Sequence, residues 1–198
     1  MIHDWSVRLG RYLEGELKLS QRDVTIVSYG LEIIIGGIIK IFFYISVPLS
    51  LGLFNQFWAA FFTAAVLRSA AGGAHCSTFC KCLLFTLLIF LGIAATSRAL
   101  SMILLPAEEI LLVSTVLAFL IFLIYAPLDV KEKPIKSANR RRWLKTISCV
   151  IAPACYVVIT HLAPGQDIIL ACSLAICFST FVVTKSGLKF IKFLDSVI

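Results

Sequence analysis

Charged side chains are scarce in this sequence: they make up only 15% of its 198 residues, whereas 60% of the residues are hydrophobic. A soluble domain is typically about 45 to 50% apolar and about 25% charged, so this composition argues against a water-soluble fold. The sequence also has no series of Asn-Gly turns and no polar–apolar alternation of the kind that indicates a β-barrel. Several apolar stretches instead reach the roughly 20 residues with which an α-helix crosses the hydrocarbon core. We therefore predict an all-α, polytopic integral membrane protein.

The amino terminus lacks the pattern of a cleaved secretory signal. Its first 23 residues mix acidic and basic side chains and contain no apolar core of roughly 7 to 15 residues, so we expect this end to remain in the mature protein. Trp5, Leu9 and Tyr12 recur there at helical spacing among the charges, which predicts an amphipathic helix within residues 1–23. That helix either lies in the membrane interface or packs on the cytoplasmic face of the bundle.

Apolar segments along the chain predict about six transmembrane helices, with amphipathic interfacial helices at both ends of a single membrane domain, residues 1–198. The predicted spans cover residues 31–53, 57–71, 78–99, 110–127, 146–163 and 168–184. The second span is short, which indicates a re-entrant or tilted segment. An amphipathic tail follows the sixth span.

Basic residues are distributed unevenly between the two membrane faces. Threading six spans from an amino terminus inside the cell puts 16 of the 18 Lys and Arg residues on one face, in segments 1–23, 68–81, 129–145 and 185–198. Cytoplasmic segments carry this excess, so we expect a multi-pass cell-membrane protein with both termini and a basic loop, residues 129–145, in the cytoplasm. Because topology accounts for the charge, we predict no nucleic-acid binding. The loop fits anchoring to anionic membrane lipids or docking of an acidic peptide.

Histidine is rare as well, and His75 is the only histidine near the clustered cysteines. It belongs to a predicted cytoplasmic segment, residues 68–82, in which Cys76, Cys80 and Cys82 follow it. A free thiol is mostly protonated at neutral pH, and a histidine that accepts its proton turns it into a nucleophile. We therefore predict a cysteine nucleophile with His75 as its base. The chemistry of the residues alone allows Cys80 as well as Cys82.

One continuous helix over residues 75–82 would separate His75 from Cys82 by about 10 Å along its axis, too far for a hydrogen bond. The helix must therefore begin after His75, leaving Cys82 in its early turns, where the positive helix end favours a thiolate. A glycine pair allows this break and two hydroxyl residues can cap the helix. These four residues are Gly72, Gly73, Ser77 and Thr78.

Three charged residues have more than one interpretation. Arg68 either holds a substrate carboxylate or a developing oxyanion, or simply follows the charge rule. Glu32, at the cytoplasmic boundary of the first span, is either exposed there or lines the reactive cavity. In the second case it is a candidate to orient the histidine, as are the two capping hydroxyl residues. Lys40 lies deeper in the same span, and the sequence assigns it no partner.

Two other interpretations of the clustered cysteines stay open. The histidine and the three cysteines after it are potential zinc ligands, although zinc sites ordinarily draw their ligands from two separated pairs. Alternatively, these cysteines only pack. The remaining cysteines lie in apolar segments, where a thiol behaves as a small hydrophobe. They are Cys149, Cys155, Cys172 and Cys177. We predict neither a metal nor a cofactor.

These residues resemble a known family, the accessory gene regulator B (AgrB) processing endopeptidases of Gram-positive quorum sensing. The shared pattern is an arginine, a glycine pair, a histidine and a cysteine seven residues after it. Here these residues are Arg68, Gly72, Gly73, His75 and Cys82. Two further stretches look like the family, SYGLEIII at the start of the first span and YAPLDVKEKPI after the fourth. The resemblance covers most of the chain.

The resemblance implies that Cys82 attacks a carbonyl of an AgrD-type precursor peptide and releases its acidic carboxy-terminal part. His75 would act first as the base and then as the acid for the leaving amine. A cysteine or serine of the precursor would take the acyl group from the enzyme and close a thiolactone or lactone ring. The seven-residue offset of the family selects Cys82 over Cys80, and the resemblance is compatible with a homodimer.

Two other classes of protein fit the residues taken alone. Glu32 and Lys40, with the histidine and cysteine cluster, would form the pathway of a small transporter or metal-binding membrane protein. The other class is a structural membrane subunit without chemistry. Labelling of a thiol by an electrophilic peptide separates an enzyme from both, and metal analysis of the purified protein reveals the metal-binding class.

Overall fold

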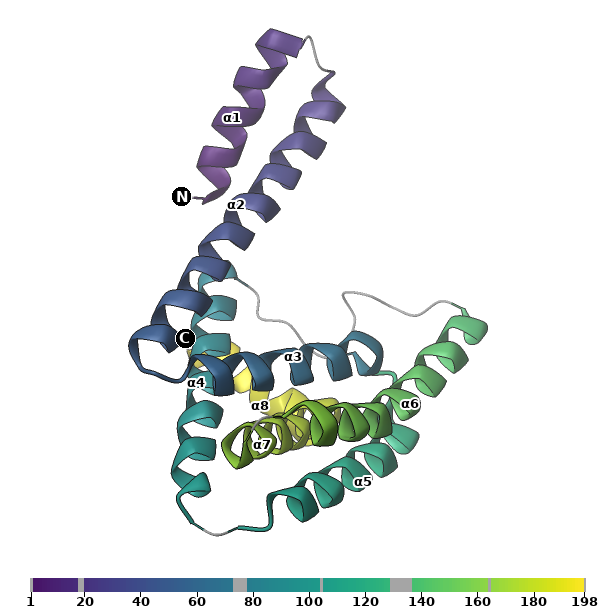
Figure 1. Cartoon of the computed structure of the whole chain (residues 1–198). Helices are drawn as coiled ribbons and strands as arrows, with labels where there is room; N and C mark the ends of the chain where they lie inside the picture. Colours follow the sequence, from purple (N-terminus) through teal and green to yellow (C-terminus); the bar gives the residue numbers. More distant parts are fainter. Residues whose placement is uncertain are drawn as a thin grey trace. The chain divides into compact units, whose positions relative to one another are not determined.

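Every regular element in the described part of the chain is an α-helix. The computed structural model describes residues 2–17, 20–72, 78–103, 105–128, 137–163 and 165–197. In chain order the helices are α1 (Ile2–Leu17), α2 (Gln21–Ser50), α3 (Phe54–Ala71), α4 (Phe79–Ser101), α5 (Ala107–Tyr125), α6 (Ala138–Leu162), α7 (Gln166–Val183) and α8 (Lys185–Val197). The prediction of an all-α protein is confirmed, and short helices begin and end the chain (Figure 1).

Five of the described helices are long and apolar enough to cross a membrane: α2, α4, α5, α6 and α7. The polytopic membrane fold is therefore confirmed. The predicted count of six is not, because α3, which corresponds to the short second span, is not among the five.

Two buried polar residues of α3, Gln56 and Thr63, have hydrogen-bond partners inside the protein. The amide of Gln56 donates a hydrogen bond to the carboxylate of Asp167 over 2.6 Å, and the hydroxyl of Thr63 donates to the carbonyl of Ala59 over 2.7 Å. Gln56 and Thr63 are buried, as are Phe57 and Leu67. A helix that packs among other helices can carry Gln56, whose partner Asp167 belongs to α7, whereas lipid would leave this amide without a partner. Packing within the bundle thus explains how α3 carries a buried amide.

Two helices extend beyond the spans that their apolar residues predict. α2 begins at Gln21 and α6 begins at Ala138, whereas the predicted spans begin at residues 31 and 146. The start of α2 is capped by Ser20, whose hydroxyl accepts a hydrogen bond from the Asp23 amide over 3.3 Å. Hydropathy detects only the part of a helix that lies in hydrocarbon. The second half of the basic segment 129–145 is consequently helical.

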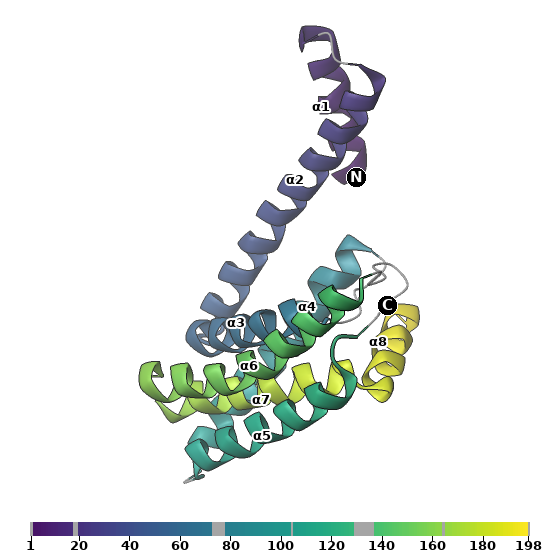
Figure 2. The same cartoon turned by 90° about the vertical axis from the view of Figure 1, so that its right-hand side faces the viewer.

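The described chain falls into two compact units, Met1–Ser50 and Leu51–Ile198. In the first unit, α1 packs along α2 in an antiparallel hairpin (Figures 1 and 2). Ser6 is buried in this hairpin, whereas Trp5 and Tyr12 are 68% and 65% exposed. One face of α1 therefore packs against α2, while the other presents an aromatic stripe outward, as an interfacial helix does.

The second unit is built around α7, which packs against α3, α4, α5, α6 and α8. In Figure 2, α3 lies on one side of α7 and α5 on the other. Small residues let the neighbours approach closely: Ala171, Ala175 and Ser173 are almost completely buried. The Ser173 hydroxyl donates to the carbonyl of Ile169 over 2.8 Å, so its burial leaves no unpaired polar group.

The corner between α7 and α8 depends on a glycine. A Cβ atom on Gly187 would overlap the carbonyl oxygen of Phe181 and lie 2.6 Å from the Cα of Val182, so only glycine fits. Thr184 fixes the turn, because its hydroxyl accepts from the Gly187 amide over 3.2 Å and donates to the Phe181 carbonyl over 2.7 Å. Beyond the corner Ile191 is buried, so α8 packs through one face against the bundle.

Candidate active site

The last turn of α3 is held in place by the chain that leaves α5. The amide of Leu128 donates a hydrogen bond to the carbonyl of Ala71 over 2.9 Å, and the amide of Gly72 donates to the carbonyl of Arg68 over 3.0 Å. Ala126 and Pro127, which are joined by a cis peptide bond, are both buried beside this contact. The start of the stretch YAPLDVKEKPI therefore lies directly against the glycine turn, although more than fifty residues separate them in sequence.

Gly72 ends α3 in a conformation that other residues rarely adopt. Its φ is 80° and its ψ is −169°, a region essentially restricted to glycine. A Cβ atom here would also lie 3.0 Å from the carbonyl oxygen of Leu128. Gly72 therefore redirects the chain toward α4 and lets Leu128 approach.

We expect Gly72→Ala to destabilise the protein by about 1 to 3 kcal/mol, because it combines a strained φ with crowding against Leu128. The matched control is Gly37→Ala in α2, where a Cβ atom would meet open space. Melting in detergent, followed by intrinsic fluorescence, measures both variants. If Gly72→Ala melts at the same temperature as Gly37→Ala, the backbone conformation of Gly72 is not required for stability.

The amino-terminal turn of α4 carries the predicted nucleophile. Thr78 is the N-cap: its backbone is extended, and its hydroxyl accepts a hydrogen bond from the Lys81 amide over 3.4 Å. The amide of Cys82 donates to the Thr78 carbonyl over 3.0 Å, so Cys82 lies in the first turn. The helix thus begins at Phe79, after His75, as predicted, and Thr78, one of the two predicted capping residues, caps it.

Cys80 and Cys82 face different sides of α4. Two residues of an α-helix rotate a side chain by about 200°. Accordingly, Cys80 is exposed and Cys82 is half-buried, and both are free of disulfides. A single imidazole cannot serve both thiols from one position.

Helix α8 reaches this turn of α4 from the far end of the chain. The ammonium group of Lys81 donates a hydrogen bond to the backbone carbonyl of Asp195, near the end of α8. A cation at the carboxyl end of a helix also interacts favourably with the helix dipole. The residue before Cys82 is therefore fastened to α8. Sequence analysis missed this contact and the Leu128 contact, because no local pattern links the partners.

The remaining predicted site residues have different positions. Arg68 is half-buried in the last turn of α3, next to Gly72. Glu32 and Lys40 are half-buried on α2, in the first unit. Four predicted residues, Gly73, His75, Cys76 and Ser77, lie outside the described residues. The described residues thus form two local arrangements: Gly72 with the segment around Leu128, and the Thr78 cap with the first turn of α4 that carries Cys82.

Within the described ranges no group of three or more His, Cys, Asp or Glu side chains is placed to hold a metal ion. His75 and Cys76 fall outside those ranges, so the zinc interpretation of the cluster is not tested. The cysteines of α6 and α7 are all reduced. Cys172 belongs to the hydrophobic core, and Cys149 and Cys155 pack against it.

Comparison with known proteins identifies the family. The model of the accessory gene regulator B family matches residues 6–183. The chain belongs to the AgrB family. An AgrB-like protein of Clostridium perfringens strain SM101 is 26% identical over 148 residues, covering 73% of this chain and 69% of the relative. One from Clostridium beijerinckii is 27% identical over 169 residues, covering 84% and 80%. No solved structure matches the chain significantly.

Membership of the AgrB family indicates the general role of this chain. The AgrB family acts in agr quorum sensing as peptide-processing membrane proteins, and an AgrD precursor is their partner. The AgrB match spans both compact units, and it includes Gly72, Thr78 and Cys82. The resemblance stated from the sequence is therefore confirmed at the level of the family.

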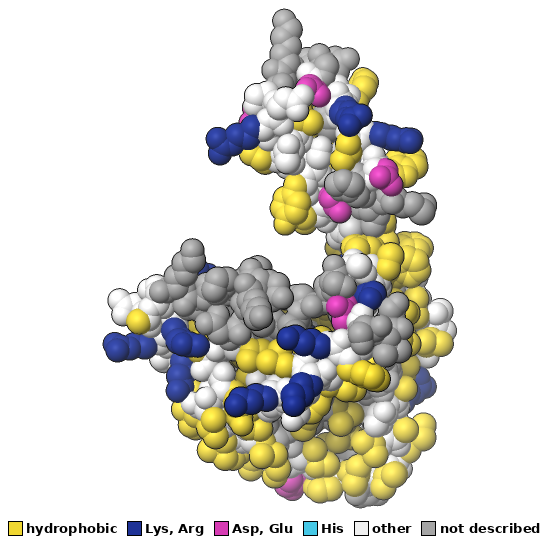
Figure 3. Space-filling view, turned by 180° about the vertical axis from the view of Figure 1, so that it is seen from behind, with side chains coloured by type: hydrophobic (Ala, Val, Ile, Leu, Met, Phe, Trp, Pro, Cys, Tyr) yellow, Lys and Arg dark blue, Asp and Glu magenta, His cyan; other side chains and the backbone are white. Residues whose placement is uncertain are grey.

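Basic side chains gather at the end of the second unit where α4 begins. Exposed Lys and Arg residues extend over the start of α6 and along α8, and Figure 3 shows them as two groups at this end. They are Arg140, Arg141, Arg142, Lys145, Lys185, Lys189 and Lys192. The opposite helix ends carry Glu108, Glu109 and Asp167, with Arg98 donating to the carbonyl of Gly52 over 3.0 Å. This charge asymmetry is typical of a cytoplasmic face.

Proposed function

We propose that this AgrB-family chain is a membrane cysteine endopeptidase that cleaves an AgrD-type precursor and cyclises the product. The observation that carries the proposal is the start of α4 at Phe79, which puts Cys82 in the first turn of a capped helix. A helix that began at His75 would hold the imidazole and the thiol about 10 Å apart, whereas this start allows them to approach each other. The half-buried position of Cys82 also restricts its access to water and to unrelated peptides.

His75 is the proposed base. It lies three positions before the Thr78 cap, and three residues of extended chain span at most about 10 Å. Cys82 lies about 6 Å from Thr78 along the helix axis. An imidazole in this loop can therefore fold back to the thiol, which a continuous helix would prevent.

The proposed reaction proceeds in two acyl transfers. The sulfur of Cys82 attacks a peptide carbonyl, and His75 passes the thiol proton to the amine as the C–N bond breaks. The carboxy-terminal fragment leaves, and the amino-terminal part remains as a thioester on Cys82. A cysteine thiol or serine hydroxyl of the precursor then attacks this thioester, closes the ring and releases the Cys82 thiol. Arg68, four residues before Gly72, would hold a substrate carboxylate or the oxyanion.

The basic residues at one end of the second unit support both an acidic peptide as the substrate and the proposed orientation of the protein in the membrane. An acidic peptide tail fits the exposed Lys and Arg residues of α6 and α8, which also favour anionic lipid surfaces. In the proposed orientation, the basic end of the second unit, the candidate site and both termini lie in the cytoplasm, and α3 is a sixth membrane helix. A second copy of the chain is a further expected partner.

Trapping the acyl-enzyme tests the proposed function. The full-length protein in phospholipid vesicles is mixed with an AgrD-type precursor whose ring-closing residue is replaced by alanine, so that the second transfer is blocked. Mass spectrometry of the intact protein should show the mass of the amino-terminal fragment added to Cys82, and hydroxylamine should remove it. An unmodified protein together with an uncleaved precursor, for every precursor of the same locus, would contradict the proposal.

A further inference from the structure

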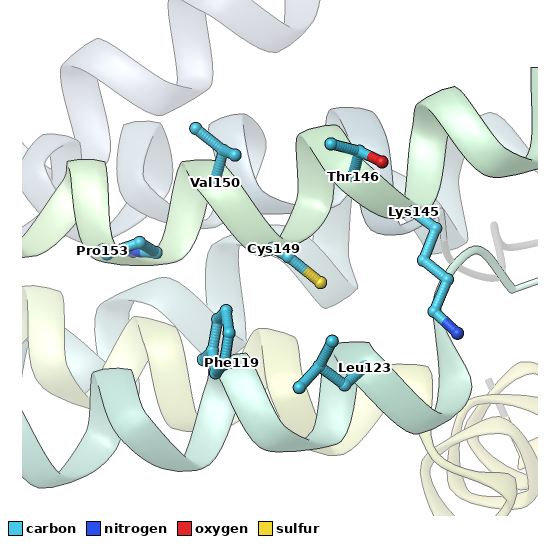
Figure 4. A pocket seen from close by; sticks show the side chains of 7 residues that line it. All are labelled: Phe119, Leu123, Lys145, Thr146, Cys149, Val150 and Pro153. Atoms are coloured by element: carbon cyan, nitrogen blue, oxygen red, sulfur yellow. The ribbon is translucent and has the colours of Figure 1, made fainter.

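A groove runs between α5 and α6 on the outer surface of the second unit. Two adjoining cavities of about 470 and 380 Å³ form it, and both are lined by Phe119 of α5 and Pro153 of α6. Figure 4 shows the first of these, with Cys149 and Leu123 facing each other across it. Apart from one end, the lining is apolar, and much of it is exposed: Val150 at the rim is 60% accessible.

The length of the groove matches one leaflet of a bilayer. Along α6 it extends from Lys145 to Tyr156, which is about 16 Å at the rise of an α-helix. Half of the hydrocarbon core of a membrane is about 15 Å thick. A helical peptide segment of that length, with a diameter of at least about 10 Å, would occupy on the order of 1,300 Å³. Both cavities together are smaller than this, so the groove suits an acyl chain better than a helix.

Lys145 gives one end of the groove a positive charge. Lys145 is exposed and lines the cavity, and Figure 4 shows its side chain extending past Leu123 at the end of α5. Trp143, two residues earlier, is 70% exposed, as is typical of residues at the level of lipid headgroups. Exposed arginines precede it in α6. The groove therefore has one positively charged end and a continuous apolar length. These two features complement an amphiphile that has one anionic headgroup and an apolar chain.

We propose that the α5–α6 groove is a binding site for an anionic phospholipid of the inner leaflet. Its phosphate receives a charge-assisted hydrogen bond from Lys145, and one acyl chain lies along Phe119 and Pro153. The basic start of α6 holds the headgroup at the depth of Trp143. This inference rests on the helix packing and on charge, not on peptide processing, so either proposal can fail without the other.

Native mass spectrometry of the full-length protein in detergent tests the site, with phosphatidylglycerol or phosphatidylcholine added as the probe. We expect the wild type to retain one phosphatidylglycerol and no phosphatidylcholine. Lys145→Gln should weaken retention about ten-fold, the factor expected for one charge-assisted hydrogen bond. The control Lys192→Gln removes an exposed charge of α8 outside the groove and should retain the lipid.

A second pair of variants tests the acyl-chain part of the site without changing charge. Val150→Trp fills the rim of the groove and should release the lipid, whereas Val157→Trp, exposed on α6 but outside the lining, should not. Equal retention of both lipids, or equal losses in Lys145→Gln and Lys192→Gln, would mean non-specific surface lipid and would overturn the proposal. Retention of a synthetic amphipathic peptide in place of phospholipid, sensitive to Val150→Trp, would also overturn it and assign the groove to a peptide.

Discussion

Replacing Cys82 by alanine is expected to abolish processing of an AgrD-type precursor, while Cys80→Ala retains it. Removal of a covalent nucleophile lowers the rate by at least about a thousand-fold, because no other group can form the acyl-enzyme. Cys80 is the natural control: it lies in the same helix turn, differs by two positions and is exposed on another side of α4. Mass spectrometry of the cleaved and cyclised products measures both variants in reconstituted vesicles.

The same comparison includes the proposed base. His75→Ala should lower cleavage nearly as much as Cys82→Ala, because the thiol would lose its proton acceptor, and the double variant should be no slower than the Cys82 variant. Such non-additivity is expected of residues that act as one unit. Cleavage that survives in Cys82→Ala and disappears in Cys80→Ala would transfer the nucleophile to Cys80. Full activity in both variants would exclude Cys80 and Cys82 as the nucleophile and would contradict the proposed mechanism.

Gly187→Ala is expected to open the corner between α7 and α8. The added Cβ atom would overlap the backbone of Phe181 and Val182, which cannot rotate away as a flexible side chain would. The corner must widen, so the Thr184 cap, the burial of Ile191 and the hydrogen bond from Lys81 to Asp195 are weakened together. Overpacking of this kind costs about 1 to 3 kcal/mol, and we expect a melting temperature lower by roughly 5 °C or more.

Gly92→Ala is the matched control for the corner. Gly92 lies within α4, and a Cβ atom there would meet nothing within 4 Å, so alanine should leave stability unchanged or raise it slightly through helix propensity. Melting in detergent gives stability, and limited trypsin digestion at the lysines of α8 reports on its docking. We expect faster cleavage at Lys189 in Gly187→Ala than in Gly92→Ala. Equal digestion and equal melting of the two variants would refute the close approach at Gly187.

Peptide processing should respond to Gly187→Ala as well, although the corner touches no substrate. α8 fastens Lys81, and Lys81 precedes Cys82 in the first turn of α4. A displaced α8 therefore removes one restraint on the nucleophile's helix end. If the corner variant melts early but cleaves at the full rate, α8 stabilises the fold without positioning Cys82.

Much of the architecture could be predicted from local sequence. The apolar lengths of α4, α5 and α7 gave spans whose ends lie within three residues of the observed helices, because hydropathy and turn residues act over short distances. For α3, local sequence did not decide whether the helix spans the membrane. Its length and composition indicate a re-entrant or tilted segment, and its hydrogen bond from Gln56 joins it to Asp167, more than one hundred residues away.

The candidate site likewise combines features that local sequence predicts with contacts that depend on the fold. The arginine, glycine pair, histidine and cysteine of the family pattern are local, so sequence named the segment and the break before α4. The contacts of Leu128 with Ala71 and of Lys81 with Asp195 join residues that no periodicity relates. They depend on how α5 and α8 pack, and packing follows from the shapes of all helices together.

The sequence by itself determined that this protein enters a membrane, that it is helical, which end of its helices is basic, and which short segment carries the thiol chemistry. Each of these follows from composition, charge or spacing over a few residues. The tertiary structure decided that α7 is the central helix of the second unit and that the ends of α5 and α8 contact the turns around Gly72 and Cys82. These are properties of close packing between remote segments, which only the folded chain brings into contact.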